Sequence, residues 1–382
     1  MESHGMTCPK IGRTAPDIKA IRDRIGSLPR GLSVVVMPDF FFDHFVHYDR
    51  DLHSFVSEME AVAERGGGNI VGPRQALLRG GNAANFASAL ASLGIRTHII
   101  GRTSMLGKVL LDQFLREKGV DLSLLRSDGE IGVTVAIELK HNNRPVNIMV
   151  SDSGSVADFS EEHIGADGFE AIRKADCVCV FSWNHMKNGN RVAEKVFAHC
   201  KHAGKGIRYL DTGDPTTSPA KARGLIETVL TRSMVDVFSV NENEVSFFTE
   251  QMYPGSGDAR SELGLTDSID KARFLHRQLN LELDLHTSDF AFAVGAHEEC
   301  IVPTYDVTPL RITGAGDSWN AGNVYGLLSG MALSDRLFFA NAVAAYYLCD
   351  KRGEHGNVLE ILRFMWNTPL KKLRTTSSGE WF

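Results

Sequence analysis

The segment Pro309-Leu-Arg-Ile-Thr-Gly-Ala-Gly-Asp-Ser-Trp-Asn-Ala-Gly322 carries the strongest structural and functional signal in the chain. The small residues from 314 to 316 allow the backbone to bend tightly and to approach a ligand closely. Residues 318–328 are typical of a helix, and the free N–H groups at a helix start attract an anion. Asp317 stands at that start, where its carboxylate can take a proton from a hydroxyl that attacks phosphorus. The pattern predicts a phosphoryl-transfer site; a plain strand-to-helix turn with an aspartate cap is the structural alternative.

A second small-residue turn occurs in Arg79-Gly-Gly-Asn-Ala-Ala-Asn-Phe-Ala-Ser-Ala-Leu-Ala-Ser-Leu-Gly94. Gly80-Gly81 predicts a tight turn, Asn82 is placed to cap the following helix, and Gly94 is placed to end it. Asn85 lies one helical turn further on, where its amide can face a ligand bound above the turn. The alternative is a closely packed helix that starts with glycine.

A third motif, Asn241-Glu-Asn-Glu244, follows the short apolar run 234–240, which is typical of a buried strand. Asn241 and Glu244 have the spacing of a capping box, which is the structural interpretation. The functional interpretation places Glu244 near a hydrated Mg²⁺ ion, since magnesium prefers oxygen ligands and keeps most of its waters. The two roles are compatible. Asp211 and Asp214 are further candidates to hold magnesium or phosphate-bound water, although Asp-Pro also favours a simple turn.

In order and spacing, these three segments resemble the ribokinase-like, PfkB-type carbohydrate kinase family, from Leu32 to about Gly353. The resemblance implies an α/β fold, specifically a ribokinase-like three-layer sandwich with a mostly parallel central sheet and a small β-sheet lid. It also implies a kinase that uses ATP and Mg²⁺ to phosphorylate a hydroxyl of a sugar or sugar-like compound.

The resemblance further implies roles for individual residues. Asp317 matches the catalytic base, and the amides of Gly314, Ala315 and Gly316 match the anion hole that holds the transferring phosphoryl group. Asp43, Gly81 and Asn85 match acceptor contacts. Glu244 with Asn241 matches the magnesium-associated motif, and Asn341 falls near the site of the nucleotide base.

Trp183 is a further candidate for an acceptor contact, this time from its own position. It follows a predicted strand, and an aromatic ring can stack on the apolar face of a sugar. A place at the rim of the core is the alternative. Asp43, Asp211 and Asn241 also follow predicted strand ends, so these side chains are expected to line one crevice.

The chain departs from the family pattern in several places. Residues 285–291 lack both glycines of the usual Thr-x-Gly-x-x-Gly turn, which leaves the phosphate contacts and the identity of the donor open. Arg311 replaces an acidic residue, as a solvated charge or a phosphate contact. The segment 102–107 lacks an aspartate, and Trp319 replaces a common phenylalanine. These departures indicate a divergent member with an unusual substrate.

Composition is typical of a soluble enzyme. The chain has 382 residues and a net charge of −6, which argues against nucleic acid as the main partner. Apolar runs are too short for a membrane span, and residues 1–10 lack a signal-peptide core. Six scattered cysteines, without zinc spacing, fit a reducing cytoplasm.

Apolar strands alternate with helices along the chain, which predicts a parallel sheet covered on both faces. Residues 132–140 and 146–150 flank an Asn-rich turn and predict a β-hairpin. We therefore expect an N-terminal extension at 1–30, helical from 16 to 25, a kinase domain at 31–370 and a C-terminal tail at 371–382. The family resemblance makes segments 43–55 and 131–151 a lid that excludes water and offers a homodimer interface; an ordinary surface hairpin is the alternative.

Two other functions remain open from sequence. A nucleoside kinase of the same fold would suit the aromatic residues Phe41, Phe42 and Trp183. A non-catalytic ligand-binding protein with a kinase fold would suit the altered turn at 285–291, although the intact Asp317 and Glu244 favour an enzyme.

Overall fold

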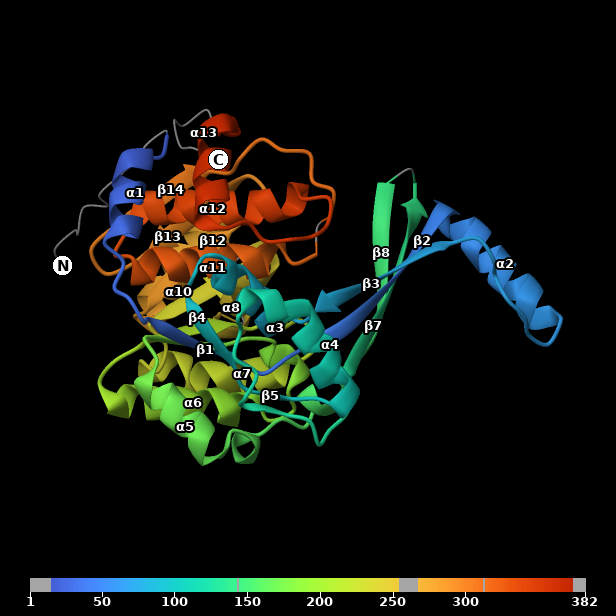
Figure 1. Cartoon of the computed structure of the whole chain (residues 1–382), viewed down its shortest axis with the longest axis horizontal. Coiled ribbons are helices and arrows are strands. Elements are labelled where there is room, and N and C mark those ends of the chain that lie inside the picture. The colour runs from blue at the N-terminus through green and yellow to red at the C-terminus, as the bar shows by residue number, and fades with distance from the viewer. Residues whose placement is uncertain (1–14, 143, 254–266, 312, 374–382) are drawn as a thin grey trace.

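An eight-stranded sheet forms the centre of the molecule, and a separate four-stranded sheet stands at one side of it (Figure 1). The computed structural model describes residues 15–142, 144–253, 267–311 and 313–373. From β12 to β4 the strands run parallel, and β13 and β14 extend the sheet in antiparallel fashion. The order across the sheet is β14 (Glu299–Pro303), β13 (Phe290–Val294), β12 (Glu282–His286), β11 (Val237–Val240), β10 (Ile207–Asp211), β9 (Cys177–Val180), β1 (Ser33–Met37) and β4 (Arg96–Ile99).

Helices cover both faces of this sheet and enclose two hydrophobic cores. Because the parallel strands are buried on both sides, they consist of continuous apolar runs rather than alternating ones. One face carries α1 (Ile18–Gly26), α3 (Asn82–Ser92), α4 (Met105–Leu115), α11 (Ala315–Leu328), α12 (Leu333–Cys349) and α13 (Val358–Asn367). The other carries α5 (Gly165–Lys174), α6 (Gly189–Ala203), α7 (Pro219–Thr228), α8 (Glu242–Met252) and α10 (Ser268–Leu279). The predicted three-layer α/β sandwich is confirmed.

Several predicted elements appear close to their expected places. The strand at 33–37 is β1, the Cys177-Val-Cys179 run is the buried strand β9, and the helix expected at 16–25 is α1. Asp17 caps α1 by accepting a hydrogen bond from the backbone N–H of Ala20 (2.9 Å). No helix in the described part of the chain has both the length and the apolarity needed to cross a bilayer.

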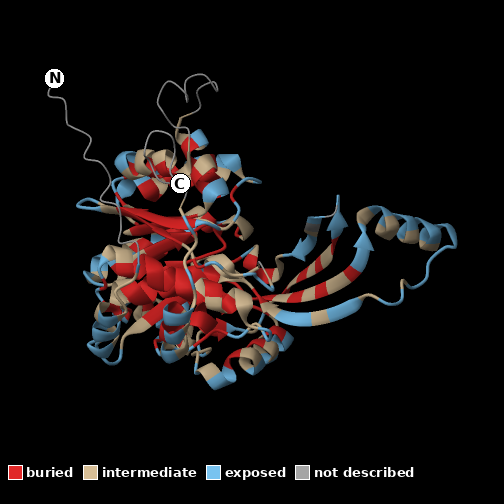
Figure 2. Cartoon of the chain, turned by 90° about the horizontal axis from the view of Figure 1, so that it is seen from above, coloured by how far each residue is buried: buried red, intermediate tan, exposed pale blue. Residues whose placement is uncertain are grey.

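The second sheet consists of four strands in the order β3 (Arg74–Gly80), β2 (Phe41–Asp51), β7 (Gly132–His141) and β8 (Arg144–Asp152). Buried and less buried residues alternate along β2 and β7, so one face is covered (Figure 2). Asp43 and Thr134 are register partners on that covered face. The predicted hairpin is therefore present, but two elements were missed: strand β3, and helix α2 (Leu52–Glu64), which occupies the end of the segment expected at 43–55.

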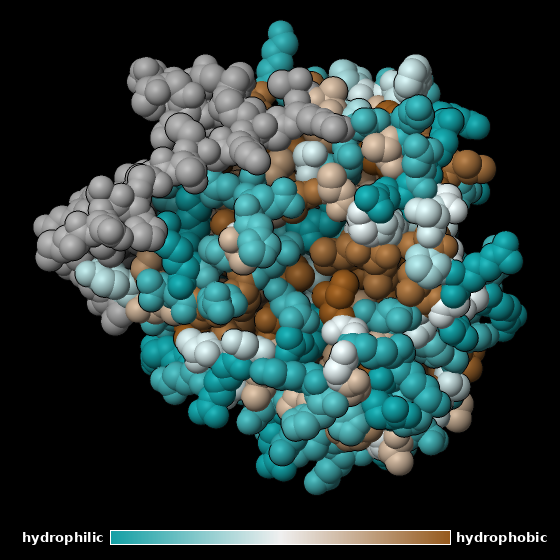
Figure 3. All heavy atoms as spheres, turned by 90° about the vertical axis from the view of Figure 1, so that its left-hand side faces the viewer, coloured by the Kyte–Doolittle hydropathy of each residue, from teal (hydrophilic) through white to brown (hydrophobic). Residues whose placement is uncertain are grey.

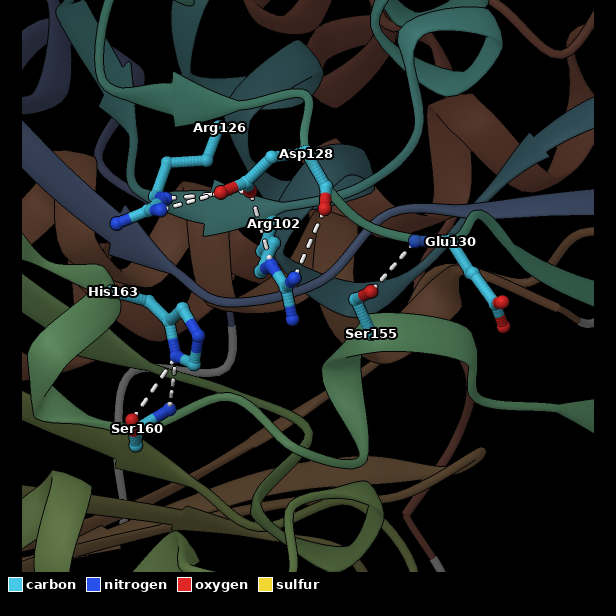
Figure 4. A network of polar contacts seen from close by, with 7 residues as sticks. All are labelled: Arg102, Arg126, Asp128, Glu130, Ser155, Ser160 and His163. Atoms are coloured by element: carbon cyan, nitrogen blue, oxygen red, sulfur yellow. Dashed lines mark hydrogen bonds and ion pairs between the residues drawn. The ribbon is translucent and has the colours of Figure 1, made fainter.

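Polar contacts tie the foot of the small sheet to the body (Figure 4). Asp128 accepts hydrogen bonds from Arg102 Nε (3.0 Å) and from Arg126. These two arginines are the last residues of the short paired strands β5 (Gly101–Arg102) and β6 (Leu125–Arg126). Nearby, the backbone N–H of Glu130 donates to Ser155 Oγ (2.6 Å), which links the residues just before β7 to those just after β8. The residues before β7 are therefore tied to β5 and β6, and the two ends of the hairpin are tied to each other.

The face turned away from the small sheet is mainly hydrophilic, with apolar residues gathered in recesses between polar ones (Figure 3). On the small sheet, by contrast, a group of large apolar side chains is exposed, namely Leu77, Leu78, Ile148, Met149 and Val150.

Candidate active site

Helix α11 begins at the tight turn that the sequence predicted. Gly314 is its N-cap, with φ +83°, a left-handed conformation that L side chains rarely adopt. A Cβ atom at this position would also lie only 3.0 Å from the Tyr347 hydroxyl oxygen. The first N–H groups of a helix have no partner inside it, so the amides of Ala315 and Gly316 are available for an anion.

Asp317 lies in the first turn of α11 and is buried. Its Oδ2 accepts a hydrogen bond from Nδ2 of Asn85 (3.0 Å), which lies in the first turn of α3. Burial raises the pKa of the Asp317 carboxyl well above its usual range, and the negative charges of Asp211 and Asp39 act in the same direction. Asp317 and Asn85, which are 232 residues apart, thus form one polar pair.

The start of α3 corrects one sequence expectation. Gly81, with φ +91°, is the N-cap, and Asn82 is the first helical residue rather than the cap. The capping carboxylate comes from Asp39, whose oxygens accept from the N–H groups of Asn82 (2.7 Å) and Ala83 (3.0 Å). Burial raises the pKa of Asp39. Asp39 was missed because its partner helix lies more than 40 residues away; its position just after the first strand is the signal that could have found it.

A cavity of about 230 Å³ opens beside Asp317, between the small sheet and the two helix starts. Asp43 reaches it from β2, and Asn85 and Gly81 line it from the start of α3. Gly80 is required next to Asp43, because a Cβ atom there would collide with the Asp43 carboxyl group. We call this the acceptor cavity; its lining comprises Phe41, Asp43, Gly81, Asn82, Asn85, Thr134, Met149, Ser151, His185, Thr313, Gly314, Gly316 and Asp317.

Trp183 does not line this cavity, which corrects its expected role as an acceptor contact. Its side chain is completely buried, its Nε1 donates to Asn190 Oδ1 (2.7 Å), and the Lys221 ammonium lies 4.1 Å from its ring. His185, two residues later, lines the cavity instead, with its Nδ1 2.8 Å from the Ser153 hydroxyl. Thr134 and Ser151, joined by a hydrogen bond of 3.0 Å, also line it and were missed, although both lie within the segment 131–151 that was expected to form the lid.

A larger and mostly apolar cavity of about 490 Å³ lies on the other side of the turn. Gly316 borders both cavities, so the turn at 314–317 separates them. We call the larger one the donor cavity; its lining comprises Asn241, Glu242, His286, Thr287, Ser288, Thr304, Tyr305, Val307, Pro309, Arg311, Ala315, Gly316, Trp319, Asn341, Ala344, Ala345, Leu348 and Lys371.

Asn341 borders the donor cavity, but its amide is already engaged. Its Oδ1 accepts from Trp319 Nε1 (2.8 Å), and its Nδ2 donates to the carbonyl oxygen of Pro303 (3.0 Å). The ring of Trp319 packs against His286, with 5.0 Å between ring centroids. Asn341 therefore holds a tryptophan that shapes the wall of the cavity.

His286 and Arg311 occupy two of the places where the sequence departs from the family pattern. The Nε2 atom of His286 is buried without a hydrogen-bond partner among the described residues, and burial lowers the pKa of this ring to about 4. The imidazole is therefore neutral. Arg311 lines the cavity while its Nη1 donates to the carbonyl oxygens of Tyr347 (2.9 Å) and Asp350, so it ties this loop to the end of α12.

Asn241 and Glu244 form the predicted capping box at the start of α8. Glu244 Oε2 accepts from the Asn241 N–H (2.9 Å), and Asn241 Oδ1 accepts from the Glu244 N–H (3.0 Å). Glu244 is buried, and burial together with the negative charge of Asp211 raises its pKa well above the usual range. Both residues border a third cavity, of about 500 Å³, whose other lining groups are Asp214, Thr216, Asn243, Ser246, Phe247 and Glu250. Across the described residues, three or more His, Cys, Asp or Glu side chains are nowhere grouped closely enough to enclose a metal by themselves.

Buried carboxylates thus surround the turn. Asp211, at the end of β10, accepts from Asn320 Nδ2 (2.7 Å) on α11, and its charge raises the pKa of Asp317 and of Glu244. Such a concentration of buried carboxylates costs stability and is typical of functional sites. These carboxylates can remove a proton beside a phosphate-binding turn. The two cavities can hold one reactant on each side of that turn.

Comparison with known proteins identifies a family of sugar kinases. Residues 51–356 match the model of the pfkB family carbohydrate kinases. A 5-dehydro-2-deoxygluconokinase of Geobacillus thermodenitrificans is 26% identical over 274 residues, which is 70% of this chain and 77% of the relative. The ribokinase of Bacillus subtilis is 23% identical over 296 residues, covering 76% of this chain and 88% of the relative.

Solved structures show the same fold. The ribokinase of Arabidopsis thaliana, solved with ribose and ATP, has a TM-score of 0.64 at 19% identity and covers 87% of this chain and 98% of its own. The fructokinase of Xylella fastidiosa with bound ATP has a TM-score of 0.66 at 15% identity, with the same coverages of 87% and 98%. The family match extends over most of the chain, and the chain therefore belongs to the pfkB family of carbohydrate kinases, as a phosphotransferase that acts on a sugar hydroxyl.

Proposed function

We propose that this protein transfers the γ-phosphoryl group of ATP to a hydroxyl of a neutral sugar or polyol, with Asp317 as the general base. One observation carries the proposal: the acceptor and donor cavities meet at the turn that bears Asp317, and Gly316 borders both. A hydroxyl in the acceptor cavity can hydrogen-bond to Asp317, while the amides of Ala315 and Gly316 face the group being transferred. The base then receives the hydroxyl proton as the oxygen attacks phosphorus.

The lining of the acceptor cavity favours an uncharged acceptor. Asp43 and Asp317 are acidic, Asn82 and Asn85 are neutral, and the lining includes neither lysine nor arginine. Two carboxylates repel an acidic sugar or a sugar phosphate, whereas they accept hydrogen bonds from hydroxyl groups. A polyhydroxylated, neutral compound fits this set of partners.

ATP is the proposed donor because the donor cavity is large and mostly apolar, which suits a nucleobase. Two structural neighbours carry ATP. Asn341, through Trp319, and Asn241 are the proposed supports of the nucleotide, and neutral His286 offers an N–H donor where the family has a glycine-rich turn. Binding in this cavity places the phosphates at the shared edge with the acceptor cavity.

The test is a screen for ADP release with ATP, magnesium and three acceptor sets: neutral sugars and polyols, sugar acids, and nucleosides. We expect turnover with a member of the first set. Turnover only with sugar acids would contradict the proposed uncharged acceptor, and turnover only with nucleosides would favour the nucleoside-kinase alternative, for which Phe41 in the lining offers a stacking ring. A folded protein that binds no nucleotide in calorimetry would favour a non-catalytic function.

Magnesium fits the third cavity through water. Its lining is rich in oxygen atoms, with Asp214 and Glu250 beside Glu244, and both carboxylate oxygens of Glu244 also accept hydrogen bonds from Asn241. We propose that Glu244 holds the hydration shell of the ion, whose charge would offset that of the nucleotide phosphates.

Replacing Glu244 with Gln is expected to raise the magnesium concentration needed for half-maximal rate by about tenfold, because one charge-assisted contact is lost. Excess EDTA should abolish turnover of the wild type. The measurement is a magnesium titration of the initial rate at saturating ATP. A Glu227→Gln enzyme, which loses an exposed carboxylate on α7 outside this cavity, is the matched control. An unchanged titration for Glu244→Gln would contradict the proposed role.

The pH dependence of acceptor use should report on Asp43. Burial raises the pKa of Asp43 to about 6, while the Thr134 hydrogen bond opposes this shift. Below that pH Asp43 is protonated and loses an acceptor for the sugar hydroxyl, so kcat/KM for the acceptor is expected to fall as pH drops through about 6. The Asp43→Asn enzyme should have a lower kcat/KM for the acceptor, and its kcat/KM should not fall between neutral pH and about pH 6. An identical limb in Asp43→Asn would assign the titration to another group.

The remaining features of the proposal concern assembly and location. Residues 31–370 would form the kinase domain, between an N-terminal extension at 1–30 and a tail at 371–382. The small sheet would act as a lid that keeps water from the phosphoryl group, and its exposed apolar side chains, such as Met149 and Val150, would pair with a second subunit. The five described cysteines are free, which suits a cytoplasmic enzyme.

A further inference from the structure

Arg79 is connected to the proposed base through a single intervening side chain. It is the penultimate residue of β3 and stands directly before the Gly80-Gly81 turn. Its Nε donates to Asn85 Oδ1 (3.1 Å), and Asn85 Nδ2 donates to Asp317 Oδ2 (3.0 Å). Three side chains from β3, α3 and α11 therefore form one continuous hydrogen-bonded series.

The direction of this series follows from the chemistry of its members. An arginine guanidinium has only donors, so the amide of Asn85 must present its oxygen to Arg79. The amide is planar, and its nitrogen must then point to Asp317. With the amide turned over, its oxygen would face the carboxylate and repel it. Arg79 thus determines which end of Asn85 meets the base.

The charge of Arg79 acts on the same carboxylate. The charges of Asp211, from β10, and of Asp39, from the residues just after β1, both raise the pKa of Asp317. The Asn85 hydrogen bond and the positive charge of Arg79 oppose them. Arg79 also lies near the hydroxyl of Tyr347 and the carboxylate of Glu354. Arg79 is thus a positive group that opposes the two carboxylates and favours the ionised form of Asp317.

We propose that Arg79 is a positioning residue for phosphoryl transfer, which fixes the amide of Asn85 and thereby orients the Asp317 carboxyl group toward the acceptor hydroxyl. The proposal rests on the proposed function of Asp317 as base. Within the described part of the chain, Asn85 is the only hydrogen-bond partner of the Arg79 side chain.

The test compares Arg79→Met, which keeps the length of the stem, with Arg79→Lys, which keeps the charge. Arg74→Met, at the exposed far end of the same strand, removes the same charge away from the cavities and is the control. For Arg79→Met we expect kcat about 10- to 100-fold lower at neutral pH. Its acidic limb in the pH profile of kcat should move up by about one unit. The KM for ATP should be unchanged, and Arg79→Lys should restore most of the limb position.

Each outcome decides the proposal. Wild-type kcat and an unmoved limb in Arg79→Met would overturn it, and so would a lower kcat with an unmoved limb, which is the mark of a purely structural role. If Arg79→Met does not fold, Arg79→Lys provides the test, because it keeps the positive charge. An acidic limb of Arg79→Lys that is shifted upward by the full unit expected for loss of the charge would overturn the proposal as well. An active Asp317→Asn enzyme would refute the base itself, whereas an inactive Asp317→Asn with a normal Arg79→Met would refute only the present inference.

Discussion

Replacing Asp317 with Asn is expected to lower kcat by about 10²- to 10⁴-fold, the usual contribution of a positioned general base. The amide keeps the size of the side chain and a partner for Asn85, but it cannot take a proton. The KM for ATP should change little, since Asp317 lines the acceptor cavity and not the donor cavity. Steady-state ADP release at saturating acceptor measures the effect.

The same substitution should not destabilise the fold. Burial raises the pKa of Asp317 above its value in the unfolded chain, so the ionised carboxylate costs folding free energy at neutral and alkaline pH. Asn removes that cost. The melting temperature of Asp317→Asn at pH 8 should therefore equal or exceed that of the wild type, and the difference should shrink as pH falls through the raised pKa. Near-normal turnover, or a melting temperature well below that of the wild type, would contradict this account.

Replacing Gly80 with Ala is expected to lower kcat/KM for the acceptor by about 10²-fold, because the new methyl group displaces the Asp43 carboxyl from the acceptor cavity. A displacement of about 1 Å at a substrate contact has effects of this order. The donor cavity does not include either residue, so binding of ATP should be unaffected. Acceptor kinetics measure the effect on the acceptor cavity, and calorimetry with a non-hydrolysable ATP analogue measures nucleotide binding.

Gly295→Ala is the matched control. It lies just after β13, where the nearest heavy atom to an added Cβ is 3.7 Å away, an ordinary contact. Both variants gain one methyl group, but only one of them meets a carboxyl group. Equal acceptor kinetics in the two variants would show that Asp43 does not need its observed position.

The turn at 314–317 shows what local sequence can predict. A left-handed φ at Gly314, a helix start at Ala315 and an acid in the first turn are all consequences of neighbouring residues. The capping box of Asn241 and Glu244 is equally local. The alternation of apolar strands and helices predicted a sheet covered on both faces, because the spacing of apolar residues within each segment distinguishes strands from helices.

Other parts of the site depend on residues far apart in the chain. Trp183 follows a strand, as a ligand contact often does, yet its ring is buried in the core. Asn190 accepts the hydrogen bond of its indole N–H, and the Lys221 ammonium lies over its ring. Asn82 has the residue type of a cap, but the carboxylate of Asp39 already fills that position. A local pattern cannot show whether a helix is capped by its own first residues or by a side chain from a distant segment.

The amino-acid sequence was enough to predict the turn and the order of strands and helices, because these follow from propensities and spacings within short segments. It also indicated a sugar-kinase family, through the resemblance of three motifs to the family pattern. The arrangement of charges around Asp317, in contrast, could be seen only in the folded structure. Arg79, Asn85 and Asp317 come from three elements, and hydrogen bonds with burial act over a few ångströms of space rather than over residues of sequence. The electrostatic setting of the base is therefore a property of the folded chain.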